Sequence, residues 1–173
     1  VERAKKLMAD AGYPDGGVST TLSYATGTPY DQIATVIQAN LAEIGVNVTL
    51  EPMETATLRS ACADGSQELF LWRWNEDSKV DFVYRDLFYT GSGSNYHHYS
   101  DPKADELVDL VATEKDQEKR LAYAQELQEY LVNACPQVPL YIANLVVAYN
   151  KNLQGQYFYG GGNHDWRHAY VAE

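Results

Sequence analysis

Apolar side chains recur every three or four residues between positions 29 and 45, and this spacing gathers them on one face of a helix. Thr28 stands in the N-cap position, Pro29 suits the first helical turn, and Gly45 is a residue type that ends helices. The apolar face consists of Ile33, Val36, Ile37, Leu41 and Ile44. The pattern predicts an amphipathic helix that packs one side against a core.

Strand patterns and helix patterns alternate along the chain as far as Trp74. Residues 46–52 alternate between apolar and polar side chains, which is typical of a strand with one buried face. Residues 67–74, QELFLWRW, form a continuous strand pattern of the kind that is covered on both faces. Helices are expected over 1–12 and 54–65, and a further strand over 18–26. This order predicts right-handed crossovers, and hence an α/β fold with an open, mostly parallel sheet and helices on both faces.

The patterns after residue 80 predict mainly helices. A short helix is expected over 81–91, and a polar, glycine-rich loop over 91–102. Ser100 or Asp101 then caps a helix that has Pro102 in its first turn. A second helix begins at Asp116, and its apolar face contains Leu121, Ala124, Leu127 and Leu131. These two helices are expected to form a helical hairpin.

Two aromatic stretches follow the predicted hairpin. Residues 137–150 predict one long strand or a pair of strands. Residues 153–173 are rich in glycine and aromatic side chains and have only weak periodicity. Neither an internal repeat nor a linker composition divides the chain, so we expect one unit over residues 1–173.

The charge of the chain argues against anionic partners. It has 24 acidic residues against 13 Lys and Arg, and a formal net charge of -11, which repels nucleic acid and anionic lipid. The longest apolar stretch, residues 138–149, contains Pro139 and Asn144 and is shorter than the roughly 20 residues of a membrane helix. We therefore expect a soluble protein. Because the chain starts with Val1 at the head of a helical pattern and not with Met and a leader, we also expect a missing upstream segment.

Aromatic residues and cysteines leave several interpretations open. Fourteen Tyr and three Trp suit a recognition surface, although core packing would use them as well. Cys62 and Cys135 lack the CxxC spacing of a zinc site or a thioredoxin-like pair. They form either one disulfide outside the cytoplasm or two separate buried thiols.

Three segments, AKKLMADAGYPDG, IATVIQANLAEIGVNVTLEP and NYHHYSDPKADELVDLVATEKDQEKRLAYAQELQEYLVNACPQVPLY, together resemble a known family in order and spacing. It is family 5 of the extracellular solute-binding proteins of ABC transporters, which bind oligopeptides, dipeptides or nickel. The resemblance implies the C-terminal lobe of a bilobed, class II periplasmic-binding-protein-like receptor. Such a receptor is free in the periplasm or tethered as a lipoprotein, uses no cofactor, closes over a solute and delivers it to a membrane permease. The tail from about residue 150 would return toward the missing lobe.

The stretch FLWRWNEDSKVDF contains the first candidate ligand residues. In open α/β sheets ligands bind beyond the carboxyl ends of the strands, and NEDSKV is the loop that leaves such an end. Trp72 and Trp74 are therefore expected to face the cleft. Arg73 lies between them and would point to the opposite face, where it is an ion-pair candidate.

The resemblance adds charged residues to this candidate site. In peptide-binding relatives the loop carries Asp-Pro-Asp, and an acid there pairs with the α-amino group of the ligand. Asp81 keeps the second acid, whereas Lys79 replaces the first and would pair with a carboxylate instead. Either Glu76 or Asp77 then binds the amine, or the ligand is not an ordinary peptide. Asp81 is equally suited to N-cap the following helix, and the two roles are compatible.

Other candidates are weaker. The resemblance places Asn95 and Tyr96 beside the cleft, and the alternative is a plain surface loop. His164 and His168 would share a metal only in a helical tail, which the glycines at 160–162 oppose. No nucleophile, base and orienting group stand out, so we expect a binding protein and no enzyme. The alternatives are a carbohydrate-binding lobe or glycan-active module, in which the Trp residues stack on sugars, and an interaction domain without a small ligand.

Overall fold

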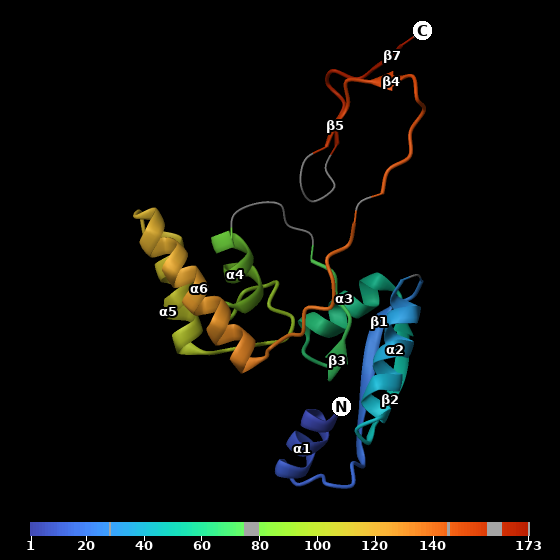
Figure 1. Ribbon diagram of the computed structural model, residues 1–173, viewed down its shortest axis with the longest axis vertical. Coiled ribbons are helices and arrows are strands. Elements are labelled where there is room, and N and C mark those ends of the chain that lie inside the picture. Colours follow the sequence, from blue (N-terminus) through green and yellow to red (C-terminus); the bar gives the residue numbers. More distant parts are fainter. Residues whose placement is uncertain (28, 75–79, 145, 159–163, 173) are drawn as a thin grey trace. The chain divides into compact units, whose positions relative to one another are not determined.

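The computed structural model describes residues 1–27, 29–74, 80–144, 146–158 and 164–172, with the backbone alone at Val80, Asp81 and Phe158 (Figure 1). The chain forms two compact units. Unit 1 comprises Val1–Arg73 and Gly93–His98, and unit 2 comprises Trp74–Ser92 and Tyr99–Glu173. The expected assignment of residues 1–173 to one lobe of a receptor concerns a larger architecture and stays a prediction.

Unit 1 is built on a three-stranded parallel sheet in the order β2, β1, β3. Strand β1 (Val18–Ala25) pairs with β2 (Val46–Met53) from Val18 opposite Val46 to Ala25 opposite Met53. On its other side β1 pairs with β3 (Leu69–Phe70), which places Ser23 opposite Phe70. The predicted parallel sheet is therefore confirmed.

Helices cover both faces of this sheet. Helix α1 spans Glu2–Asp10, α2 spans Tyr30–Ala42 and α3 spans Thr55–Ala63. Helix α2 leads from β1 out to β2, whereas α3 leads back past β1 to β3, so right-handed crossovers put α2 and α3 on opposite faces. Strand β1 is accordingly buried on both sides: Leu22 and Tyr24 join the core that contains Ala34 of α2, and the intervening Ser23 is fully buried.

The predicted strand over residues 67–74 is much shorter in the structure. Only Leu69 and Phe70 are in β3, and the ladder ends with the Leu71 amide, which donates to the Ser23 carbonyl oxygen at 2.9 Å. Strand β3 is at the edge of this sheet and has Leu69 41% exposed, so it is not covered like a central strand. The chain leaves the ladder at Trp72, whose ring packs against another aromatic ring.

Glu68 fixes the entry to β3 by long-range hydrogen bonds to β1. Its Oε2 accepts from the Thr20 hydroxyl at 2.9 Å and from the Thr21 amide at 3.0 Å. Nearby, the buried Ser23 hydroxyl bonds to a carboxylate oxygen of Glu51 at 2.8 Å and to the amide oxygen of Gln67. These contacts hold the connection between α3 and β3 against the central strand.

Unit 1 is expected to lose stability in acid because of Glu68. The Thr21 amide and the Thr20 hydroxyl lower the pKa of Glu68 in the folded chain. A carboxyl group with a lowered pKa stabilises the fold above its unfolded-state pKa, and this contribution is lost as the pH falls through the folded-state pKa. Urea unfolding of wild type and Glu68→Gln between about pH 6 and about pH 3 measures the effect. Wild type should lose more stability than the variant, and parallel pH profiles would contradict the prediction.

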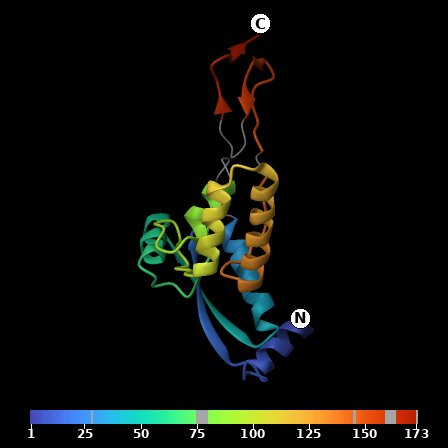
Figure 2. The same cartoon turned by 90° about the vertical axis from the view of Figure 1, so that its left-hand side faces the viewer.

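Unit 2 begins with three helices. Helix α4 spans Val80–Phe88, α5 spans Pro102–Thr113 and α6 spans Gln117–Ala134. The side chain of Asp101 caps α5 by accepting from the amides of Lys103 at 2.8 Å and Ala104 at 3.1 Å. Of the two predicted caps, Asp101 is therefore the one that binds. Asp116 caps α6 in the same way, and the antiparallel α5 and α6 form the predicted hairpin (Figure 2).

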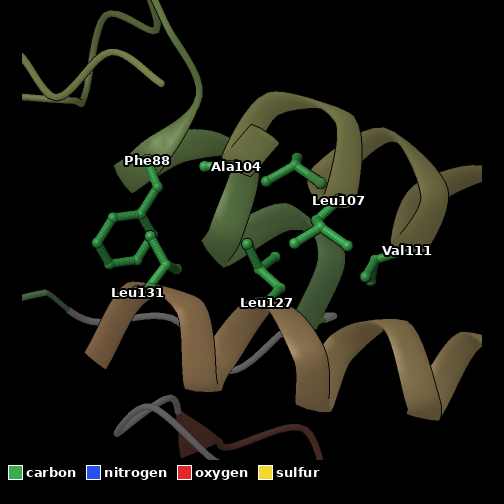
Figure 3. Packing of buried hydrophobic residues seen from close by; sticks show 7 residues of the cluster. Phe88, Ala104, Leu107, Val111, Leu127 and Leu131 are labelled. Carbon is green, nitrogen blue, oxygen red and sulfur yellow. The ribbon is translucent and has the colours of Figure 1, made fainter. Parts of the chain in front are cut away.

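The hydrophobic core of unit 2 lies between these helices (Figure 3). Arg85 of α4 adds a polar tie, since its Nη2 is 2.5 Å from Asp109 Oδ1 of α5 and its guanidinium lies over the Tyr89 ring. Leu121 was expected on the apolar face of α6 but is 61% exposed. The buried residues of the cluster are Phe88, Ala104, Leu107, Val108, Val111, Leu127 and Leu131.

The strand prediction over residues 137–150 is wrong for the described residues of that range, none of which is in a strand. Ile142 and Val146 are 96% and 88% exposed, so no sheet covers these side chains. Apolar character favours a strand only where a neighbouring strand supplies hydrogen bonds, and in the described part of the chain this stretch runs without one.

The tail contains two short antiparallel pairs. Strand β4 (Leu153–Gln154) pairs with β7 (Tyr170–Val171), and β5 (Tyr157–Phe158) pairs with β6 (His164–Asp165). His164 is in β6 and His168 is in a turn, so the helical spacing that would bring them to one face does not occur. Within the described ranges, no helix is both long enough and apolar enough to cross a membrane.

Candidate functional site

The carboxyl edge of the unit 1 sheet brings two segments together. Helix α3 starts two residues after β2 ends, and Trp72 follows β3 by two residues. Because β2 and β3 are both parallel to β1, these two positions are at the same edge. This is the edge where open α/β sheets bind ligands.

A pocket of about 570 Å³ opens beside α3, and all of its lining belongs to unit 1. Small side chains in the lining leave room for a ligand. The groups that could bind it are one guanidinium, three hydroxyls and an aromatic ring. The pocket is lined by Thr55, Ala56, Arg59, Ser60, Ala63, Gly93 and Tyr96.

Trp72 lies beside two of the pocket residues, Arg59 and Tyr96. The Arg59 Cζ atom is 5.9 Å from the centroid of the Trp72 ring, which is cation–π range. On the loop side, Trp72 and Tyr96 meet edge to face, with ring centroids 5.2 Å apart and an interplanar angle of 86°. The indole therefore lies beside both the guanidinium and the phenol.

The loop that carries Tyr96 is fastened to α3. The His98 Nε2 atom is hydrogen-bonded to the Cys62 carbonyl oxygen, with a separation of 3.1 Å. Gly65 leaves room for this ring, because a Cβ atom there would be 3.1 Å from His98 Nε2. Asn95 is buried at 5% exposure and anchors the middle of the loop. The position of Tyr96 is thus set by contacts on both sides of it.

The two cysteines are separate thiols, and Cys62 lies on the helix that lines this pocket. Both thiols are free, so the disulfide alternative is wrong. The alternative of two separate buried thiols is correct for Cys62 and wrong for Cys135, which is exposed. Burial raises the pKa of the Cys62 thiol to about 11. A thiol with this pKa stays protonated near neutral pH and is a poor nucleophile.

Comparison with known proteins places this architecture in a family. The family of bacterial extracellular solute-binding proteins, family 5, middle region, matches residues 1–96, which is more than half of the chain. The chain belongs to this family. The resemblance of three sequence segments had predicted the same assignment.

Individual relatives agree with the family 5 assignment. The glutathione-binding protein GsiB of Salmonella typhimurium is 29% identical over a 165-residue alignment that covers 88% of this chain and 32% of that protein. The periplasmic binding protein DppA of Helicobacter pylori, solved with the peptide STSA, gives a TM-score of 0.74 at 28% identity over 80% of this chain and 28% of its own. The family 5 chain therefore spans about a third of the length of the relatives it matches.

The fold extends over the whole chain. The oligopeptide-binding protein AppA of Bacillus subtilis gives a TM-score of 0.81 over 99% of this chain and 37% of its own, at 22% identity, which shows the fold alone. These neighbours are bilobed periplasmic binding proteins, and the predicted α/β fold class of one such lobe is confirmed.

The structure brings together some of the predicted ligand residues of the family 5 chain. Trp72 and Tyr96 are in contact at the pocket, and the neighbouring Asn95 is buried in the same loop. Trp74 belongs to unit 2 and is half-buried, and its indole Nε1 has no hydrogen-bond partner among the residues that the structure describes. Arg73 is exposed. Glu76, Asp77 and Lys79 lie outside the described residues.

Asp81 is not the N-cap of its helix. Helix α4 begins at Val80, so Asp81 is the second residue of the first turn, and its side chain lies outside the described part of the chain. The expected cap is wrong because the helix already includes Val80, the residue before Asp81.

Arg59, Thr55 and Ser60 are pocket residues that sequence reasoning missed. Leu58 and Cys62 are four residues apart and fully buried, so they define the core face of α3. That spacing implies that Thr55 and Arg59, which are also four apart, share another face. No local pattern, however, connects this face with Trp72, which is thirteen residues after Arg59 in the sequence.

Proposed function

We propose that this chain is the C-terminal lobe of the solute-binding component of an ABC importer, which captures a peptide or peptide-like solute and delivers it to a membrane permease. Family membership supports the class, and a glutathione-binding relative and a relative solved with a bound peptide support the type of solute. Members of this family are extracellular, and we propose a periplasmic or lipid-tethered location for the intact receptor.

The observation that carries the proposal is the pocket at the carboxyl edge of the sheet. Arg59 and Tyr96 supply a cation and a hydroxyl to the lining, and Trp72 packs beside both of them. Ligand sites combine apolar walls with a few polar groups that orient the ligand, and this lining has that composition. In the proposed receptor the pocket forms part of one wall of the interlobe cleft.

Mass spectrometry of the intact receptor that carries this chain tests the solute class. The receptor is purified without denaturation, unfolded, and the released small molecules are identified. Peptides or peptide-like molecules are the expected result. Release of an oligosaccharide would overturn the peptide assignment in favour of the carbohydrate alternative. Absence of any released molecule, together with no calorimetric heat from a tripeptide mixture, would reject the proposed function.

The 173-residue chain is the control for the same experiment. It should retain no solute, because an incomplete cleft leaves ligand groups in water and the binding free energy falls accordingly. Tight retention of a peptide by the isolated chain would show that the second lobe contributes little, and would contradict the two-walled site.

A further inference from the structure

We infer that Arg59 binds a carboxylate group of the solute, and that Trp72 holds the guanidinium in place for this contact. The inference rests on the proposed function and names the group that the pocket selects. It follows from three observations: the position of the cation, the lack of an acidic partner among the described residues, and its aromatic support.

Arg59 is available for a negatively charged ligand. The chain has a net charge of -11, and several of its cations are paired with acids. Arg85, Lys103 and Arg167 are all paired with carboxylates. Arg59 forms no ion pair within the described residues; its guanidinium lies near the Trp72 ring, and its side chain lines the pocket. The other pocket side chains add hydroxyls and small apolar groups but no acid.

The contact with Trp72 orients the charge. A guanidinium over an indole keeps its N–H donors directed away from the ring, and a carboxylate accepts two of them in parallel. The Tyr96 ring meets Trp72 edge to face, so the indole itself cannot turn freely. Lysine would keep the charge but lose the planar, two-donor geometry. Replacing Arg59 by lysine should therefore weaken carboxylate binding, and replacing it by an uncharged residue should weaken it further.

Two parts of a peptide supply a carboxylate: its C-terminus and an acidic side chain. Calorimetry with the intact receptor uses four probes, Ala-Ala-Ala, its C-terminal amide, and the amides of Ala-Glu-Ala and Ala-Gln-Ala. Each probe is titrated into wild type, Arg59→Ala and Arg59→Lys. Arg3→Ala serves as the matched control, since it removes the same charge from the exposed surface of α1, which is at the amino edge of the sheet.

We expect wild type to bind one carboxylate-bearing probe about tenfold or more tightly than its uncharged counterpart. In Arg59→Ala the two probes should bind with equal affinity. In Arg59→Lys the affinity ratio should lie between one and the wild-type value, and in Arg3→Ala it should equal the wild-type value. If the tripeptide binds more tightly than its amide, Arg59 binds the C-terminal carboxylate. If the Glu-containing amide binds more tightly than the Gln-containing amide, Arg59 binds an acidic side chain.

Two other outcomes overturn the inference in different ways. If wild type binds the probes but the ratios are the same in Arg59→Ala as in wild type, peptide binding stands and the role of Arg59 is wrong. If wild type binds none of the probes, the proposed peptide function fails and the inference fails with it. Comparing probes within each variant makes the ratio independent of any change in the fraction of folded protein.

Discussion

Replacing Leu58 by alanine is expected to lower the free energy of unfolding of unit 1 by about 2 to 5 kcal/mol. Leu58 is fully buried on the inner side of α3. Truncation removes apolar contacts and leaves a cavity in the core. The helix also carries Thr55, Arg59 and Ser60 into the pocket. Urea unfolding followed by circular dichroism measures the loss.

Leu7→Ala is the matched control for this variant. Leu7 is in α1 of the same unit, but its side chain is 58% exposed. The same truncation there should cost less than about 1 kcal/mol, because most of the apolar surface is already in contact with water. Equal losses in the two variants would mean that α3 is not packed on the sheet as the structure has it.

Gly45→Ala is expected to destabilise unit 1 by about 3 kcal/mol or more. Gly45 has φ +80°, a conformation that strains residues with a Cβ atom. A Cβ atom there would also be 2.6 Å from the Cα atom of Gly16, and Gly16 would have to move together with its backbone. The Gly17 amide donates to the Gly45 carbonyl oxygen at 2.8 Å in the same contact, so the turn before β1 and the end of α2 would separate. Thermal unfolding measures the change.

Gly17→Ala separates the cost of the positive φ angle from the cost of the close backbone contact. Gly17 has φ +88°, but nothing lies within 4 Å of a Cβ atom at that position. Its substitution should cost only the conformational strain, about 1 to 2 kcal/mol. A cost for Gly45→Ala no larger than that for Gly17→Ala would show that the close approach of the two glycine backbones is not a constraint on the fold.

Sequence periodicity predicts an element correctly where that element is defined by its own residues and by one apolar face. The helix that ends near Gly45, the strand over 46–52 and the caps Asp101 and Asp116 all have such local signals, and each is in the structure. The parallel sheet followed as well, since a strand and helix alternation leaves few other arrangements.

The sequence predictions fail where an element depends on contacts with residues that are distant in the sequence. The apolar run of residues 137–150 has the composition of a strand, yet a strand exists only beside another strand, and the described residues leave Ile142 in water. Strand β3 stops at Phe70 because Trp72 packs on Tyr96, which is in a different loop. Composition alone contains no information about either neighbour.

At the candidate site, too, residues with a local sequence signal could be predicted and residues defined by long-range contacts could not. The two tryptophans stood out because they are at the end of the predicted strand over residues 67–74, and one of them, Trp72, lies beside the pocket residues Arg59 and Tyr96. Arg59 was missed because its importance arises only when α3 and the end of β3 meet in space. Long-range pairs such as Glu68 with Thr20 are equally invisible in the sequence, since 48 residues separate them.

The affinity of the intact receptor for its released solute, measured by calorimetry in Trp72→Ala and in Trp166→Ala, tests the central claim most directly. Both variants lose one indole, but Trp72 supports Arg59 and Tyr96 at the pocket, whereas Trp166 is half exposed in the tail and stacks on His164. Trp72→Ala should cost about 1 to 3 kcal/mol of binding free energy, and Trp166→Ala should cost almost nothing. Unchanged affinity in Trp72→Ala, or an equal loss in both variants, would contradict the assignment of the solute site to this edge of the sheet.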